Sequence, residues 1–109
     1  MILDVPLSSD FSYIFTIILE QVTYRIRVNW VGKEDSWYMD LYDRLGEPLI
    51  LGHKITYNSL ILNKYHANER VPQGEFLLLP GESGGLDKPT FNSVSNGDTF
   101  YYITSDELV

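Results

Sequence analysis

Side chains that could do chemistry are few and widely separated in this sequence. The chain has 109 residues, no cysteine and two histidines, His53 and His66. A zinc site needs three or four ligands at set spacings, and neither histidine lies in an HExxH pattern or beside suitably spaced carboxylates. We therefore expect both histidines to be exposed loop residues, and we predict no metal site and no cofactor.

Two carboxylates and a glycine-rich run are the other candidates for chemistry. A hydrolase that uses paired acids needs them at a set separation across a cleft, whereas Asp40 and Asp43 are close in sequence near a turn. The run PGESGG at 80–85 lacks the lysine and the strand–loop–helix setting of a phosphate cradle. No serine lies in a GxSxG elbow. We predict no catalytic residue and no enzyme activity, and a small hydrolase built on Asp40 and Asp43 is one alternative.

Aromatic side chains are the remaining candidates, because they can contact a sugar, a single-stranded nucleic acid or another protein. Trp30 and Trp37 flank a short loop and are expected to pack in the core as a cross-strand pair. Tyr38 and Tyr42 have the opposite parity to Trp37, so they are expected to face outward as contact residues. A carbohydrate-binding β module that uses these two tyrosines is the alternative function.

Period-two alternation indicates the elements that position these residues. Residues 22–30 alternate apolar side chains with polar ones such as Arg25 and Arg27, which is the pattern of a half-buried strand. Residues 13–19 are apolar on both faces and should form a hairpin with 22–30 through a tight turn at Glu20-Gln21. Arg25 and Arg27 are expected to pair across the sheet with acids such as Asp40.

Further strands are expected at 37–42, 48–51, 76–79 and 99–104. Gly46 is expected in a left-handed turn position, and Pro48 is expected to start a strand at a sheet edge. Six or so short strands predict an all-β fold, a small antiparallel barrel or sandwich with one or two short helical turns. The length suits a single domain, residues 1–109.

The two helical turns are predicted where alternation fails. Asn58 or Ser59 could cap a short helix over residues 60–65, and Thr90 could cap a turn that carries Phe91 and Val94. The first segment carries Leu60, Ile61, Leu62 and Tyr65, and the last three are the candidate contact residues. If they are exposed they need a partner; the other reading is that they cover the core.

The net charge of −7 restricts the partners. Its long-range field repels nucleic acid and anionic membranes, so neither is expected as a partner. The apolar run at 13–19 is too short to span a bilayer, and the opening MILDVPL lacks the basic and apolar regions of a secretory signal. We therefore expect a protein that is used where it is made.

The order of the landmarks resembles a known family. The chain reads Tyr13-x-Phe15, then Tyr24-x-Ile26-Arg27-x-x-Trp30, then Trp37-Tyr38-x-Asp40-Leu41-x-Asp43-x-x-Gly46-x-Pro48-Leu49. A segment ending at Tyr65, a strand led by Gly74, a Gly-Gly…Pro-Thr loop and a tyrosine-rich strand follow. This series is similar to the small baseplate plug family of contractile-tailed phages, of the cyanophage type, and the similarity extends over nearly the whole chain.

The resemblance implies a role and no catalytic site. It implies a structural virion protein of the tail baseplate, made in the host cytoplasm and packed near the tail axis against hub, tail tube and spike proteins. Several copies in a ring are expected, because closed rings reuse one interface many times. The segments that fit an isolated domain least well are expected to make the contacts, and these are the N-terminus, residues 55–66, the 80–91 loop and the tail after Thr104. The candidate interface residues are Tyr38, Tyr42, Ile61, Leu62, Tyr65 and Phe91.

Overall fold

The computed structural model describes residues 2–8, 10–81, 88–91, 93–95 and 97–108. The described chain is built from short strands joined by turns and by single-turn 3₁₀ helices. The strands are β1 (Ile2–Asp4), β2 (Ser12–Leu19), β3 (Val22–Val31), β4 (Ser36–Asp43), β5 (Pro48–Lys54), β6 (Glu75–Leu79) and β7 (Thr99–Ile103). The 3₁₀ helices are η1 (Gly32–Glu34), η2 (Asn63–Tyr65), η3 (Ser93–Ser95) and η4 (Ser105–Leu108).

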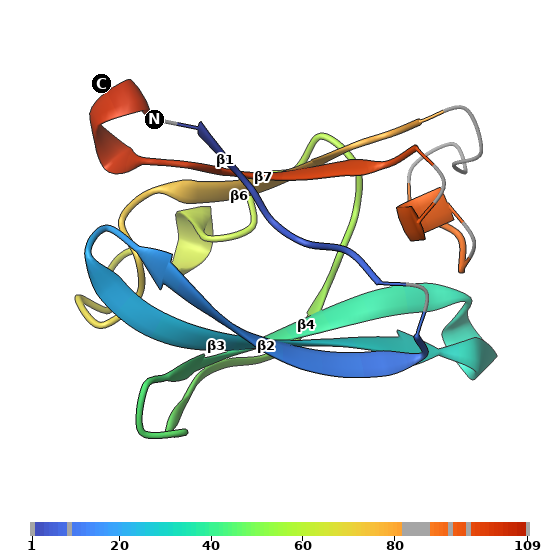
Figure 1. Cartoon of the computed structure of the whole chain (residues 1–109), viewed down its shortest axis with the longest axis horizontal. Coiled ribbons are helices and arrows are strands. Elements are labelled where there is room, and N and C mark those ends of the chain that lie inside the picture. The colour runs from blue at the N-terminus through green and yellow to red at the C-terminus, as the bar shows by residue number, and fades with distance from the viewer. Residues whose placement is uncertain (1, 9, 82–87, 92, 96, 109) are drawn as a thin grey trace.

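The strands form two antiparallel sheets, which lie as separate layers in Figure 1. One sheet has the order β2-β3-β4-β5 and the other has the order β1-β7-β6. The sheets do not close into a barrel, so the predicted antiparallel all-β fold is confirmed in its two-sheet form. Strand β1 was not predicted, because three residues are too short to show alternation; it is a strand because it pairs with β7.

The β2–β3 hairpin follows from its sequence pattern. Glu20 and Gln21 both have positive φ, 53° and 66°, as a two-residue type I′ turn requires. Leu19 is therefore opposite Val22, and the register continues along the whole of β2. On β3 the side chains of Tyr24, Ile26 and Val28 are buried, and those of Arg25 and Arg27 are exposed.

The β4–β5 hairpin also matches the prediction. Trp37, Met39 and Leu41 of β4 are fully buried. The Asp43 carboxylate accepts hydrogen bonds from the amides of Leu45 and Glu47, each at 2.9 Å, and Gly46 has a φ of +88°. β5 begins at Pro48 and is an edge strand, as predicted.

The segment between β5 and β6 is not the helix that the sequence predicts. Asn58 has a φ of +58°, which a helix cap does not adopt, and the only helical part is the single turn η2. The chain instead runs along β6. The Asn58 amide donates to the Leu78 carbonyl at 3.0 Å, and the Ile61 amide donates to the Phe76 carbonyl at 3.3 Å. Main-chain pairing with a strand distant in sequence therefore replaces local helix bonds here.

One cluster of buried side chains joins the two sheets. Leu19, Ile26 and Leu41 contribute from one sheet, and Phe76 and Tyr102 contribute from the other. Strand β6, whose residues 76–79 are uniformly apolar, is buried on both faces. Before η3, the Thr90 side chain accepts a hydrogen bond from the Ser93 amide at 3.2 Å, so this predicted cap is confirmed. The glycine-rich run at 80–85 lies mostly outside the described residues.

Candidate interaction surfaces

The outer face of the four-stranded sheet carries the two tyrosines that the sequence predicts to face outward. Tyr38 and Tyr42 are half-buried on β4, on either side of Asp40. The Tyr38 hydroxyl donates to the Glu34 carboxylate, and that hydrogen bond raises the pKa of Tyr38. The Tyr42 hydroxyl donates to Asp40 at 3.3 Å, and the Gly52 amide donates to the other oxygen of Asp40 at 2.6 Å. The face is therefore a pre-organised polar and aromatic surface.

Tyr65 lies at a second place, on η2, where it packs on the β5 histidine. Its hydroxyl and the Nδ1 atom of His53 are joined by a hydrogen bond of 3.0 Å, and the two rings meet edge-on. The Lys64 ammonium lies 5.4 Å from the centre of the Tyr65 ring. Burial and the nearby Lys64 charge lower the pKa of His53. His53 is thus half-buried in a strand, so the expectation of an exposed loop histidine is wrong for it.

Ile61 and Leu62 do not form the exposed apolar cluster that the sequence suggests. Their side chains are 1% and 0% exposed, in the core beside β6. The reason is that the segment is pinned to β6: the Leu62 amide donates to the buried Glu75 carboxylate at 2.6 Å. The other reading of these residues, that they cover the core, is the one that the structure shows, and Tyr65 alone of the three is partly accessible.

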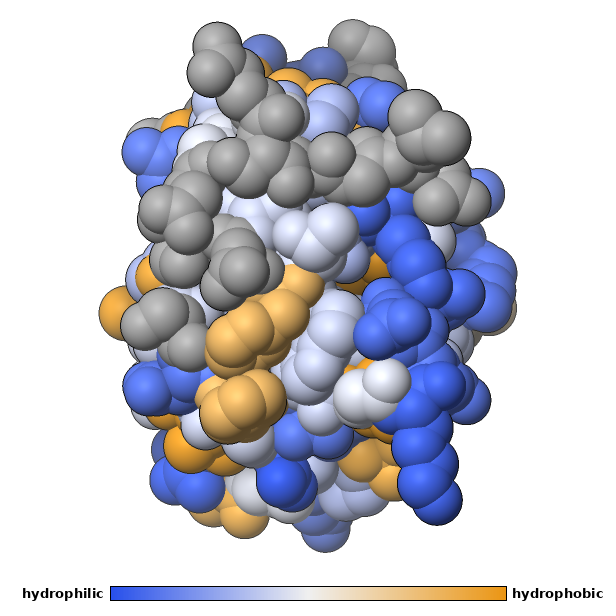
Figure 2. Space-filling view, turned by 90° about the vertical axis from the view of Figure 1, so that its right-hand side faces the viewer, coloured by the Kyte–Doolittle hydropathy of each residue, from blue (hydrophilic) through white to orange (hydrophobic). Residues whose placement is uncertain are grey.

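Phe91 belongs to an aromatic stack at one end of the sandwich. The centre of its ring lies 4.5 Å from that of Phe11 and 5.7 Å from that of Trp37. Trp30 meets Trp37 edge-on at 5.3 Å, so the predicted cross-strand pair is confirmed, but only Trp37 is fully buried and Trp30 is half-buried. The Trp37 indole donates to the Thr90 carbonyl at 3.0 Å. Figure 2 faces the end where η3 lies and shows apolar surface beside hydrophilic residues. Phe11 is 65% exposed, so the stack reaches the surface there.

An apolar strand edge is the surface that reasoning from the sequence missed. Ile14 and Ile18 of β2 are 59% and 64% exposed, and among the described strands β2 has only β3 as a neighbour. The signal was present in the sequence, because residues 13–19 are apolar at both parities, whereas β3 is apolar at one. It could not be used without knowing that β2 lies at the edge of its sheet.

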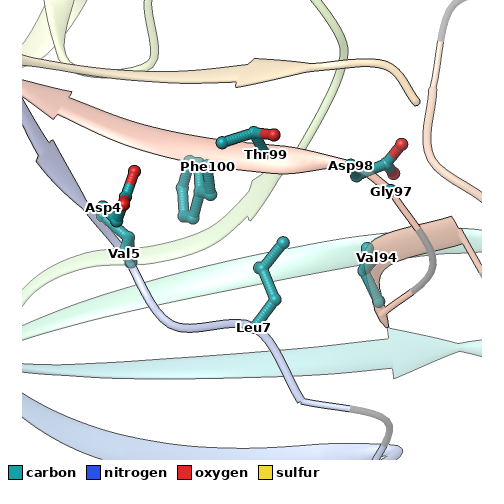
Figure 3. A pocket seen from close by; sticks show the side chains of 8 residues that line it. All are labelled: Asp4, Val5, Leu7, Val94, Gly97, Asp98, Thr99 and Phe100. Carbon is teal, nitrogen blue, oxygen red and sulfur yellow. The ribbon is translucent and has the colours of Figure 1, made fainter.

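A shallow hollow between β7, η3 and the N-terminal segment is shown in Figure 3. Its lining combines the apolar Leu7, Val94 and Phe100 with the carboxylates of Asp4 and Asp98. Asp98 is buried and is fully used: it accepts hydrogen bonds from the Tyr57 hydroxyl at 2.8 Å, the Ser93 hydroxyl at 2.7 Å and the Gly81 amide at 2.8 Å.

This network joins β7 to the segments beside it, which is a structural task. Burial raises the pKa of the Tyr57 phenol to about 12, so the hydroxyl stays protonated and continues to donate to Asp98. The sequence offers no pattern that would bring Tyr57, Ser93 and Asp98 together, since they lie in three separate segments.

Glu75 is the one fully buried carboxylate in the described part of the chain. One carboxylate oxygen accepts from the Leu62 amide, and the other has no hydrogen-bond partner among the described residues. His66 Nε2 lies 3.9 Å from that second oxygen and 2.9 Å from the Gly74 carbonyl. Burial raises the pKa of Glu75.

The residues first considered for chemistry are used for structure. The Asp40 carboxylate accepts a hydrogen bond from the Gly52 amide. The Asp43 carboxylate accepts hydrogen bonds from the turn amides and, at 2.5 Å, from the Arg70 guanidinium. The two carboxylates therefore do not face each other across a cleft. Among the described residues no group of three histidine, cysteine, aspartate or glutamate side chains could hold a metal ion. In the same part of the chain, no helix has the length and apolar character needed to cross a membrane.

Comparison with known proteins gives one family. A family model described as "Cyanophage baseplate Pam3 plug gp18" matches residues 2–106. No curated protein matches the chain.

Proposed function

This chain belongs to the family of the cyanophage baseplate Pam3 plug gp18, and from that membership we propose that it is a non-enzymatic structural subunit of a contractile phage tail baseplate. The observation that carries the proposal is the extent of the match, which runs through both sheets. A phage baseplate plug is a structural part of the virion tail, which fits a fold in which Asp40, Asp43 and Asp98 accept internal hydrogen bonds.

In this proposal the chain acts as a single domain, is made in the host cytoplasm, and packs near the tail axis against hub, tail tube and spike proteins. Several copies share one interface around the axis. The contact residues are Tyr38 and Tyr42 on the outer face of β4, Tyr65 on η2 and Phe91 in the aromatic stack, because each is only partly buried in the isolated chain. Tyrosine and phenylalanine are enriched at protein interfaces.

Co-expression with the hub and tail tube proteins of the same phage tests the proposal. We expect a stable complex that survives size-exclusion chromatography. Replacing Tyr38 with Ala should weaken that complex, whereas Tyr101→Ala, at a half-buried tyrosine of the other sheet, is the matched control. A chain that binds neither tail protein would contradict the proposed function. Binding to a glycan array that is lost in Tyr38→Ala would support the carbohydrate-binding alternative instead.

A further inference from the structure

The sheet edges of this molecule are not equally protected. The edge strands are β2 and β5 in one sheet and β1 and β6 in the other. Residues 57–61 lie along β6 and bond to it, β5 begins at Pro48 and has an irregular register near Gly52, and β1 has only three residues. Proline, irregularity, shortness and cover are the devices by which proteins protect sheet edges from pairing with other chains.

Strand β2 has none of these devices. It is eight residues long, with the sequence SYIFTIIL, and holds no proline, glycine or charged residue. Its register with β3 is unbroken from Ser12 to Leu19. Of the described strands it is therefore the one on which a further strand can add without obstruction.

The hairpin geometry fixes which groups of β2 face outward. A two-residue turn makes Leu19 and Val22 a hydrogen-bonded pair, and every second residue repeats that pairing. The amide and carbonyl groups of Ile14, Thr16 and Ile18 therefore point away from β3, toward the free edge. These residues also have the exposed side chains of the strand. Backbone groups and apolar side chains are thus presented together along one edge.

Charge indicates the kind of strand that fits. Between residues 11 and 31 the only acid is Glu20, whose carboxylate is held by the Ser105 amide and hydroxyl. The same hairpin carries Arg25 and Arg27, in a chain whose net charge is −7. The Arg27 guanidinium lies over β2, since its Nε donates to the Ser12 hydroxyl at 3.4 Å, and it lines a hollow with Ser12, Tyr13 and Ile14.

A second copy of this chain fits that edge poorly. Two copies joined there would bring together two hairpins with the same excess of positive charge, and like charges at a contact are unfavourable. A strand that offers apolar side chains at alternate positions and a carboxylate near Arg27 satisfies every exposed feature of the edge.

We propose that the free edge of β2 is the docking site for an extended strand of a neighbouring tail protein, which adds to the sheet by main-chain pairing with Ile14, Thr16 and Ile18. This strand has apolar side chains facing Ile14 and Ile18 and an acidic side chain near Arg27. The inference rests on the proposed function, because it assigns the contact through which the subunit joins the baseplate. Main-chain bonds supply the affinity in such an arrangement, and alternate side chains supply the specificity.

The test measures binding to the hub and tail tube proteins of the same phage, by biolayer interferometry with each purified protein. The double variant Ile14→Lys, Ile18→Lys should weaken binding about tenfold or more, because buried lysines cannot be solvated at the added strand. Leu51→Lys is the matched control, since Leu51 is 62% exposed on the opposite edge strand, and its affinity should stay within about twofold. Arg27→Glu should weaken binding and reverse its dependence on salt.

Amide hydrogen exchange of the unmutated chain gives a second readout that does not depend on a variant's folding. The outward amides of Ile14, Thr16 and Ile18 should exchange fast in the free chain and slowly in the complex, while Phe15 and Ile17 are protected in both. Side-chain contact without strand addition would not produce this alternation, so its absence in the complex would overturn the proposal.

The outcomes separate this inference from the proposed function. If the chain binds a tail protein and the double lysine variant binds equally well, the docking site is wrong and the proposed function stands. If the purified chain is a dimer that the double lysine variant converts to monomer, the occupant is a second copy, and the assignment to a tail protein is overturned. If the chain binds no tail protein, both the proposed function and this inference are wrong.

Discussion

Gly46 shows how one residue type fixes a turn. Its φ of +88° lies in a region that residues with a side chain rarely adopt, and its amide donates to the Asp43 carbonyl at 3.0 Å. Gly46→Val should destabilise the fold by about 1–3 kcal/mol, because a β-branched side chain resists positive φ. Urea denaturation followed by tryptophan fluorescence measures the change.

Gly32→Val is the control for this prediction. Gly32 is also exposed, lies in η1 and has no positive φ, and a side chain there would meet only the Trp30 indole at ordinary contact distance. Its loss of stability should be clearly smaller. Equal losses in the two variants would mean that the positive φ of Gly46 is not the cause.

Glu75 should make stability depend on pH. Burial raises its pKa in the folded chain above the ordinary value of 4.5, so the folded state holds the proton more tightly than the unfolded state does. The contribution of Glu75 to stability is therefore most favourable below pH 4.5 and declines as the pH rises through the raised folded pKa. Glu75→Gln keeps an oxygen for the Leu62 amide but cannot ionise. Its melting temperature should therefore fall less between pH 4 and pH 8 than that of the unmutated chain, and thermal melts across that range measure the difference.

Glu69→Gln serves as the control for the pH measurement, because Glu69 is exposed. Its melting temperatures should follow those of the unmutated chain at every pH. Parallel curves for Glu75→Gln and the unmutated chain would show that Glu75 does not carry the effect.

At the residue scale, parity along a strand was a good guide to burial where the strand was long. Trp37, Met39 and Leu41 are buried and Tyr38 is partly exposed, as alternation predicted. It gave no guide for Ile61, because the conformation of that residue is set by hydrogen bonds to β6. Those bonds depend on a partner far away in the sequence, and no local pattern encodes them.

At the element scale, the hairpins could be predicted because each closes through a short turn that is recognisable in the sequence. Glu20-Gln21 and Asp43–Gly46 lie between alternating runs, and both hairpins form as expected. The pairing of β1 with β7 and the path of residues 55–62 along β6 are contacts between segments far apart in the chain. The same holds for the candidate surfaces. Alternation along β4 predicted that Tyr38 and Tyr42 face outward, whereas the free edge of β2 depends on the strand order of the sheet and was not predicted.

The hydrogen-bond network around Asp98 should stabilise the arrangement of the elements it joins. Tyr57→Phe removes the hydroxyl that bonds to Asp98 at 2.8 Å and to Ser93 at 3.2 Å, and it leaves the ring in place. We expect a loss of about 1–3 kcal/mol in the free energy of unfolding, because a buried carboxylate loses a donor. Chemical denaturation measures the loss.

Tyr101→Phe is the comparison for this network. Tyr101 lies on β7 and is half-buried, so removal of its hydroxyl tests the cost of losing a tyrosine oxygen outside the Asp98 network. If Tyr101→Phe lowers the free energy of unfolding as much as Tyr57→Phe does, the Asp98 network does not contribute more to stability than a tyrosine hydroxyl elsewhere.

At the scale of the whole molecule, the two sheets are expected to unfold as one unit. Their buried side chains form one cluster, and the Trp37 indole of one sheet is bonded to Thr90 in the segment that leads to β7 of the other. A shared core makes partial unfolding costly, since either sheet alone would expose its apolar face to water. Thermal unfolding should therefore show one transition, with the same midpoint by tryptophan fluorescence, which reports on Trp30 and Trp37, and by far-ultraviolet circular dichroism, which reports on both sheets. Two separated midpoints would show that the sheets are independent, and the assignment of the chain to a single domain would then be wrong.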